Sequence, residues 1–180
     1  QLALNSGVAA IGILMLLSVV FGNWRNLLLV LANLPFALVG GILALAFTRW
    51  VTAGEGPGVS VGSLVGFVTL FGITTRNSIM LISHFEGLVA MEGLPWNRAT
   101  ALRGASERLI PISMTALVTA LGLLPLALGA GEAGREIEGP MAIVILGGLL
   151  TSTALNLLVL PALALRFGRF APPAPDAVEG

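Results

Sequence analysis

Cysteine is absent from the 180 residues of the chain, and charged residues make up only 10% of them. Without cysteine the chain can hold neither a disulfide framework nor a thiolate metal site. Its nine basic and nine acidic residues give a net charge of zero, so it lacks the basic field that attracts nucleic acid. The sequence also contains no recognisable nucleophile triad, phosphate-binding loop or metal-binding cluster. The residues themselves therefore offer no candidate for catalysis or for binding a cofactor.

Hydrophobic residues, in contrast, make up 56% of the chain, and its mean hydropathy is +0.97. Such a composition is typical of proteins that sit in a lipid bilayer. Five apolar runs are each long enough to cross about 30 Å of hydrocarbon as a helix. They cover about residues 2–21, 27–47, 60–84, 109–129 and 141–165. The sequence therefore predicts an all-α membrane protein with five transmembrane helices within residues 1–170.

The segments outside these runs are short and polar. Because the links are short, neighbouring helices should run antiparallel. Residues 171–180 are rich in proline and polar residues, and we expect them to form a disordered tail. The chain begins at Gln1 and is apolar from Leu2, with no basic leader. We therefore interpret residues 2–21 as a transmembrane span and not as a signal peptide, and the chain as a fragment of a longer protein.

The arginines predict how the chain is oriented, because loops with excess positive charge stay in the cytoplasm. One side of the predicted spans carries Arg25, Arg98, Arg103, Arg108, Arg166 and Arg169. The other side carries only Arg49 and Arg135. We therefore expect the N-terminus of the chain outside, in the periplasm, and its C-terminus in the cytoplasm.

The link at 92–108 has a helical pattern of its own. Pro95 suits the first turn of a helix, and apolar residues then recur at helical spacing. They are Trp96, Ala99, Leu102, Ala105 and Leu109. This pattern predicts a short amphipathic helix over about 95–107 in the cytoplasmic interface, and a plain solvated linker is the alternative.

Small residues and prolines predict how the spans pack. Small residues let helix backbones approach closely where lipid supplies no hydrophobic force. The glycines expected at such contacts are Gly40, Gly41, Gly62, Gly66, Gly72, Gly147 and Gly148. Proline leaves a helical carbonyl without its partner, so kinks are expected near prolines within spans. These prolines are Pro35, Pro111, Pro125 and Pro161.

Arg76 lies deep inside the run 60–84. A guanidinium keeps its proton in proteins, and in mid-span it costs about 2.5 to 3.5 kcal/mol. Every carboxylate of the sequence lies in a link, at a span end or in the tail. Snorkelling to the cytoplasmic interface is one explanation, but Arg76 lies about 12 Å of helix inside His84. We therefore expect an acidic partner on a helix outside this chain.

Methionine and histidine are the remaining candidates for binding a metal. Met15, Met80 and Met114 lie in predicted spans and could pass along a soft cation such as Cu(I). Methionine is also a common gap filler in helix packing. His84 stands alone at a span end, so we interpret it as an interfacial histidine and not as a ligand. The sequence predicts no metal site.

Three long stretches resemble one known family. They are LFGITTRNSIMLISH, RGASERLIPISMTALVTALGLLPLALG and REIEGPMAIVILGGLLTSTALNLLVLPALALRFGRF. They resemble the C-terminal membrane half of resistance-nodulation-division (RND) efflux permeases, and are most similar to the heavy-metal branch of cobalt-zinc-cadmium and copper-silver pumps. The resemblance implies that the five spans are the eighth to twelfth helices of a twelve-helix bundle. It also implies that the first membrane half and the periplasmic domains are missing.

The resemblance implies a role for four residues. In this family, acidic residues on the fourth helix take up and release protons, and a basic residue on the tenth helix answers them. Arg76 holds that basic position, where multidrug relatives usually carry lysine. Because arginine keeps its proton, we assign Arg76 the role of a fixed counter-charge, and Asn77 that of a neighbour in the relay. Arg108 and Thr115 match family positions on the proton path, although an interfacial anchor and a back-bonding helix residue explain them equally well.

By this resemblance the chain is part of a proton-driven efflux permease, a secondary active antiporter of the bacterial inner membrane that exports heavy-metal cations. Its implied partners are the missing N-terminal half, further copies in a homotrimer, a periplasmic adaptor and an outer-membrane channel. Two alternatives remain open. One is a multidrug pump for amphiphiles, and the other is a membrane scaffold subunit that transports nothing.

Overall fold

A computed structural model describes residues 12, 15, 24–54, 56, 58–168 and 170 of the chain. Within this part the chain forms helices and no strand, which confirms the all-α prediction there. The helices are α2 (Trp24–Ala32), α3 (Leu34–Val51), α4 (Val61–Ala90), α5 (Arg98–Leu128) and α6 (Glu138–Phe167). Four helical segments in the described residues are long and apolar enough to cross a membrane: Leu28–Val51, Val61–Ala90, Arg98–Leu128 and Glu138–Phe167. The predicted span 2–21, apart from residues 12 and 15, and the predicted tail 171–180 lie outside the described residues.

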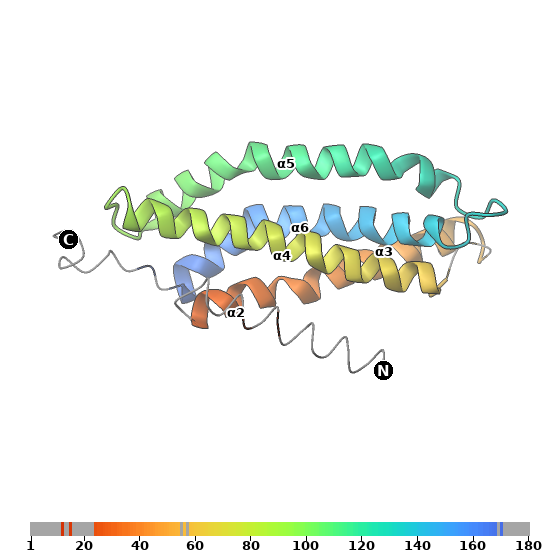
Figure 1. The fold of residues 1–180 in the computed structure, drawn as a ribbon, viewed down its shortest axis with the longest axis horizontal. Coiled ribbons are helices and arrows are strands. Elements are labelled where there is room, and N and C mark those ends of the chain that lie inside the picture. The colour runs from red at the N-terminus through yellow and green to blue at the C-terminus, as the bar shows by residue number, and fades with distance from the viewer. Residues whose placement is uncertain are drawn as a thin grey trace.

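Helix α6 is the centre of the bundle. It contacts α3, α4 and α5, whereas α3 and α5 do not contact each other in the described part of the chain. Figure 1 shows α5 on one side of α6 and α3 with α2 on the other, with α4 lying alongside α6. From α4 to α6, each helix runs antiparallel to the one before it, as the short links predicted (Figure 1).

The predicted span 27–47 is interrupted. Helix α2 ends at Ala32, Asn33 forms a turn, and α3 then runs to Val51. Pro35 lies in the first turn of α3, where its missing N–H does no harm to α3 itself, but it cannot donate to the backbone oxygen of Leu31, as a continuation of α2 would require. The chain therefore contains a break near one end of this span. The other prolines, Pro111, Pro125 and Pro161, lie inside helices that continue past them, and Figure 1 shows that α5 follows a curved path.

A separate interfacial helix over 95–107 is not confirmed. The Asn97 side chain accepts a hydrogen bond from the backbone N–H of Thr100 at 2.9 Å, which caps the start of α5. From Arg98 the helix continues without interruption to Leu128. Within α5 its buried face agrees with the predicted one only at Ala105, because small residues allow this helix to pack closely against α4. Thr100, Ala101, Gly104 and Ala105 are buried, whereas Leu102 and Leu109 are exposed.

Glycines lie where α6 meets α3 and α4, as predicted. A Cβ atom on Gly40 would lie 2.9 Å from the backbone oxygen of Gly147, and the reverse substitution would bring a Cβ equally close to the oxygen of Gly40. A Cβ on Gly66 would lie 2.9 Å from the backbone oxygen of Met141. Gly72 is the exception: a Cβ there would meet nothing within 4 Å, so its predicted place at a helix contact is not confirmed among the described residues.

Candidate functional site

Arg76 lies near the middle of α4, on the side of the helix that the bundle leaves uncovered. The residue is exposed, and its side chain makes no hydrogen bond or ion pair with the residues that the structure describes. The buried residues of α4 lie on other faces of the helix and include Thr74, Ser78 and Leu81. The predicted acidic partner is therefore not among the described residues.

Asn77 follows Arg76 but faces a different environment. Successive residues of a helix are about 100° apart, and only 3% of the Asn77 surface is exposed. Its Nδ2 atom is buried and has no hydrogen-bond partner among the described residues, and neither has the Oγ1 atom of Thr74 one turn earlier. Buried donors are normally paired. Asn77 and Thr74 thus leave hydrogen-bonding capacity inside the bundle beside the uncovered arginine.

Arg108 belongs to a cluster at the end of the bundle where α4 ends and α5 begins. Its Nη2 atom lies 3.3 Å from Nδ1 of His84, and Nε2 of His84 lies 2.7 Å from Oε2 of Glu107. The neutral histidine with its proton on Nε2 satisfies both contacts, because Nδ1 then accepts and Nε2 donates. Arg103 extends the cluster to Glu107 and Glu92, at 2.8 and 3.0 Å. This cluster joins α4 to α5 and resembles an interfacial anchor more than a ligand set.

Thr115 behaves as a back-bonding residue. Its hydroxyl donates to the backbone oxygen of Pro111 at 3.0 Å, and Thr119 bonds in the same way to the backbone oxygen of Thr115. Thr115 is exposed. No side-chain hydrogen bond in the described residues joins any two of Arg76, Asn77, Arg108 and Thr115. Their role in a proton path stays a prediction.

The structure also brings together three polar residues that the sequence analysis missed. Asn33, Ser78 and Asn156 come from three separate parts of the fold, and all are buried and joined by hydrogen bonds. Each lies inside a strongly apolar stretch, which is the signal that could have singled them out, because uncharged polar residues within spans often bond to one another across helices. Their mutual pairing, however, requires the tertiary structure.

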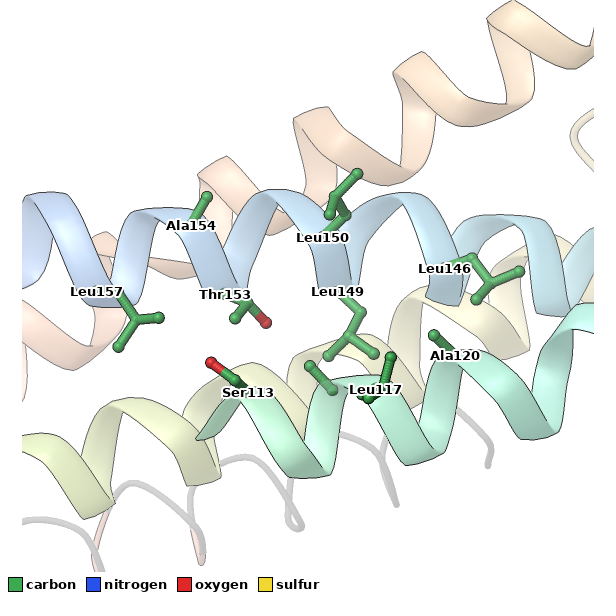
Figure 2. A pocket seen from close by; sticks show the side chains of 10 residues that line it. Ser113, Leu117, Ala120, Leu146, Leu149, Leu150, Thr153, Ala154 and Leu157 are labelled. Carbon is green, nitrogen blue, oxygen red and sulfur yellow. The ribbon is translucent and has the colours of Figure 1, made fainter. Parts of the chain in front are cut away.

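A cavity of about 370 Å³ lies between α5 and α6. Its lining is mostly leucine and alanine, and Figure 2 shows the hydroxyls of Ser113 on α5 and Thr153 on α6 pointing toward each other across it. The Oγ1 atom of Thr153 is buried without a hydrogen-bond partner in the described residues. The candidate metal-binding methionines do not line this cavity, and Met15 and Met114 are exposed. The described residues contain no group of three or more His, Cys, Asp or Glu side chains placed to hold a metal ion.

Comparison with known proteins finds, along nearly the whole chain, the family that the sequence resembles. A profile of the AcrB/AcrD/AcrF family matches residues 1–167. The cobalt-zinc-cadmium resistance protein CzcA of Cupriavidus metallidurans is 42% identical over 156 residues, which are 87% of this chain and 14% of that protein. The nickel and cobalt resistance protein CnrA of the same organism is 40% identical over 134 residues, which are 74% of this chain and 12% of that protein. The swarming motility protein SwrC of Bacillus subtilis is 34% identical over 173 residues, covering 96% of this chain and 16% of that protein.

A solved structure gives the same result for the fold. The X-ray crystal structure of a heavy metal efflux pump matches this chain with a TM-score of 0.70 and 35% sequence identity, and the match covers 90% of this chain and 16% of that one. The chain thus spans only a small part of the length of the proteins it matches. Within that part, the sequence profile, the curated relatives and the solved structure agree that this chain belongs to the AcrB/AcrD/AcrF family of RND efflux permeases, and that heavy-metal resistance proteins are among its relatives.

Proposed function

We propose that this chain is the C-terminal membrane part of a proton-driven permease that exports heavy-metal cations. Arg76 is the observation that carries the proposal. It is a permanent positive charge near the middle of α4, on a face that no described helix covers, and no described residue pairs with it. A charge at that depth needs a counter-charge. The proposal assigns that counter-charge to carboxylates on a helix of the permease outside this chain.

The proposed mechanism uses Arg76 as a fixed charge and not as a proton carrier. Carboxylates that face it attract it while they are ionised and release it when protons from the periplasm neutralise them. The two pairing states favour different positions of α4 relative to the other half of the permease. Rocking of the helices then drives the periplasmic domains to expel the cation.

Asn77, Arg108 and Thr115 have supporting roles in the proposal. Asn77 offers a buried amide donor one residue from Arg76. Arg108 bonds to His84 and so ties α5 to α4 at one end of the bundle. Thr115 lies about 10 Å further along α5 by helical rise, where its hydroxyl could contribute to a proton path once another part of the permease faces it.

The proposal extends to location and assembly. The end of the bundle that holds the start of α5 and the end of α6 carries Arg98, Arg103, Arg108 and Arg166, and loops rich in arginine stay in the cytoplasm. We therefore propose that this end faces the cytoplasm of a bacterium and that the chain lies in the inner membrane. The family resemblance adds a homotrimer that works with a periplasmic adaptor and an outer-membrane channel. The cation class follows from the names of the relatives, which include cobalt, zinc, cadmium and nickel.

The test replaces Arg76 in the complete permease and measures cation efflux from liposomes under an imposed proton gradient. We expect Arg76→Ala to lower efflux at least about 100-fold, because it leaves buried carboxylates without their counter-charge. Arg76→Lys should retain a measurable part of the activity, because lysine keeps the positive charge. Arg98→Ala is the control, since Arg98 is also an exposed arginine but lies at the start of α5.

Two results would count against the proposal. If Arg76→Ala transports as fast as the parent, Arg76 is not part of the coupling, and the scaffold interpretation gains support. If the parent couples a proton gradient to the efflux of amphiphilic dyes but not of metal cations, the multidrug alternative replaces the metal pump while the role of Arg76 stands.

A further inference from the structure

Asn33, Ser78 and Asn156 form a hydrogen-bonded triangle inside the bundle, in which the buried Nδ2 atom of Asn156 has no partner among the described residues. Asn33 lies between α2 and α3, Ser78 is in α4 and Asn156 is in α6, and their exposed fractions are 5%, 0% and 0%. Nδ2 of Asn33 donates to Oγ of Ser78 at 2.8 Å and to Oδ1 of Asn156 at 2.6 Å. Oγ of Ser78 donates to the same Oδ1 atom at 2.9 Å. Every member of the network is therefore bonded to both of the others.

This network ties the middle of α4 to the rest of the bundle. Two polar neighbours of Ser78 on α4, Thr74 and Asn77, have buried polar atoms with no partner among the described residues. The other side-chain bonds from α4 to described residues of other helices lie nearer its C-terminal end, at His84 and Glu86. Separating Ser78 from its two partners would leave buried polar groups unpaired, which is unfavourable in an apolar interior.

The position of Ser78 determines where Arg76 points. Residues two apart on a helix differ by about 200° in direction, so Ser78 and Arg76 lie on nearly opposite sides of α4. When the network holds Ser78 against α6 and Asn33, it turns Arg76 away from them. The burial of Ser78 and the exposure of Arg76 in this structure agree with this geometry.

We propose that Asn156 is a positioning residue for Arg76. Together with Asn33 and Ser78 it fixes the rotation of α4, so that the guanidinium faces the part of the permease outside this chain. The inference rests on the proposed function, because it assumes that Arg76 acts in transport. It also predicts that transport depends more on Asn156 when position 76 holds arginine than when it holds lysine. The planar guanidinium bonds in a fixed geometry, whereas lysine is a point charge on a flexible stem and depends less on the rotation of its helix.

The experiment compares the same substitution in two backgrounds of the complete permease. Asn156→Ala is introduced into the parent and into Arg76→Lys, and efflux from liposomes under a fixed proton gradient is measured per folded molecule. We expect Asn156→Ala to lower efflux about 10-fold in the parent and no more than about 2-fold in the Arg76→Lys background. Ser78→Ala should show the same pattern with at least as large a loss, because Ser78 is the member of the network that lies on α4, whereas Asn156→Ala leaves the bond between Asn33 and Ser78.

The matched control is Ser152→Ala. Ser152 is one turn before Asn156 on α6 and is equally buried, but its hydroxyl donates to the backbone oxygen of Leu149 in its own helix, at 3.2 Å. Its replacement should leave efflux per folded molecule unchanged in both backgrounds.

Equal fold-losses from Asn156→Ala in the two backgrounds would overturn the inference, because the network would then support only folding. Parent-like efflux per folded molecule from Asn156→Ala would overturn it as well. If Asn156→Ala does not fold, the same comparison with Ser78→Ala decides. Failure of the proposed function gives a different result, namely parent-like efflux from Arg76→Ala.

Discussion

Single charged residues are held differently at the two ends of the bundle. At the arginine-rich end, His84 on α4 contacts Glu107 and Arg108 on α5, so the charges join two helices. At the other end, charged residues bond within one link. Arg135 lies 3.5 Å from Glu132, three residues earlier in the link that precedes α6. The first arrangement fixes helices relative to each other, and the second shapes a loop.

Glu136 gives a prediction that belongs to the residue scale. The backbone N–H of Gly134 donates to its Oε1 atom at 3.1 Å, and this bond lowers the pKa of Glu136 below the usual value of 4.5. The bond favours the charged carboxylate. Its contribution to the stability of the loop is therefore present above that usual value and is lost as the pH falls through the lower pKa of the folded state.

Carboxyl NMR titration of the protein in detergent would measure this pKa. The Glu136 signal is assigned by its loss in Glu136→Gln. A midpoint at or above the usual value would contradict the hydrogen bond seen in the link.

The sequence predicts individual residues well when their chemistry alone is informative. Arg76 stands out because a permanent charge in an apolar run needs a partner wherever the helix packs. Asn156 does not stand out in this way, because an uncharged amide in a span is costly only if it is unpaired. Its partner Asn33 is 123 positions away in the sequence, and one sequence does not show that they meet.

Among the helices, close packing depends on where the glycines lie. The glycines of α4 illustrate both possibilities. A Cβ on Gly62 would clash with the backbone oxygen of Ile137, just before α6, whereas a Cβ on Gly72 would meet nothing within 4 Å. Both residues lie in the same helix, so the difference comes from the approach of a neighbouring segment and not from helix propensity.

Substituting these two glycines tests that packing. We expect Gly62→Ala to destabilise the helical bundle by about 1 to 3 kcal/mol, because a backbone oxygen cannot move aside as a flexible side chain can. The matched substitution Gly72→Ala should be neutral or should stabilise by up to about 1 kcal/mol, since alanine has the higher helix propensity. Midpoints of unfolding in a denaturing-detergent titration of this chain, in which no other part of the permease faces Gly72, would compare the two. Equal midpoints would mean that α4 does not approach the start of α6 as closely as described.

Helix boundaries were less predictable than the existence of the helices. Apolar runs indicate the part of a helix that lies in hydrocarbon, but α4 continues to Ala90 and α5 begins at Arg98, beyond the apolar runs on which the prediction rested. The amphipathic pattern at 95–107 predicted the packing face only in part, because Ala105 is buried as expected, whereas the larger Leu102 is exposed and Gly104 is buried in its place. In a closely packed helix pair, small residues can be more informative than large apolar ones.

On the scale of the whole molecule, the bundle is unevenly covered. In the most apolar stretch of α6, 44% of the residues are buried, but in that of α5 only 6% are. The outer surface of α5 is apolar and includes Val118, Leu121 and Leu128. These side chains suit contact with lipid or with the rest of the permease. The uncovered face of α4 differs from this surface of α5, because it carries the charge of Arg76.

The incomplete charge pairing predicts the behaviour of the chain on its own. Purified and placed in liposomes, the 180-residue chain should show no proton-coupled cation flux, because no described carboxylate pairs with Arg76. The complete permease in identical liposomes is the positive control. Coupled flux by the chain alone would show that the acidic part of the relay is not required.

The antiparallel order of the helices followed from the short links, but the central place of α6 did not. Runs of similar hydropathy do not show which helix is surrounded by the others. The glycines on α6 gave a partial indication, since Gly147 and Gly148 let α3 and α4 approach it. The cavity between α5 and α6 had no signal in the sequence, because its lining residues are ordinary span residues.

The hydrogen bonds of Ser78 to Asn33 and Asn156 hold α4 at one point along its length. The helix has 30 residues, which is about 45 Å by helical rise, so it is longer than the hydrocarbon core of about 30 Å. Ser78 lies 17 positions after Val61 (78 − 61), about 25 Å from that end. If α4 tilted by about 10° around Ser78, its Val61 end would therefore move by about 4 Å. Because Gly62 leaves no room for a Cβ atom against Ile137 at that end, such a tilt of α4 would have to carry the start of α6 with it.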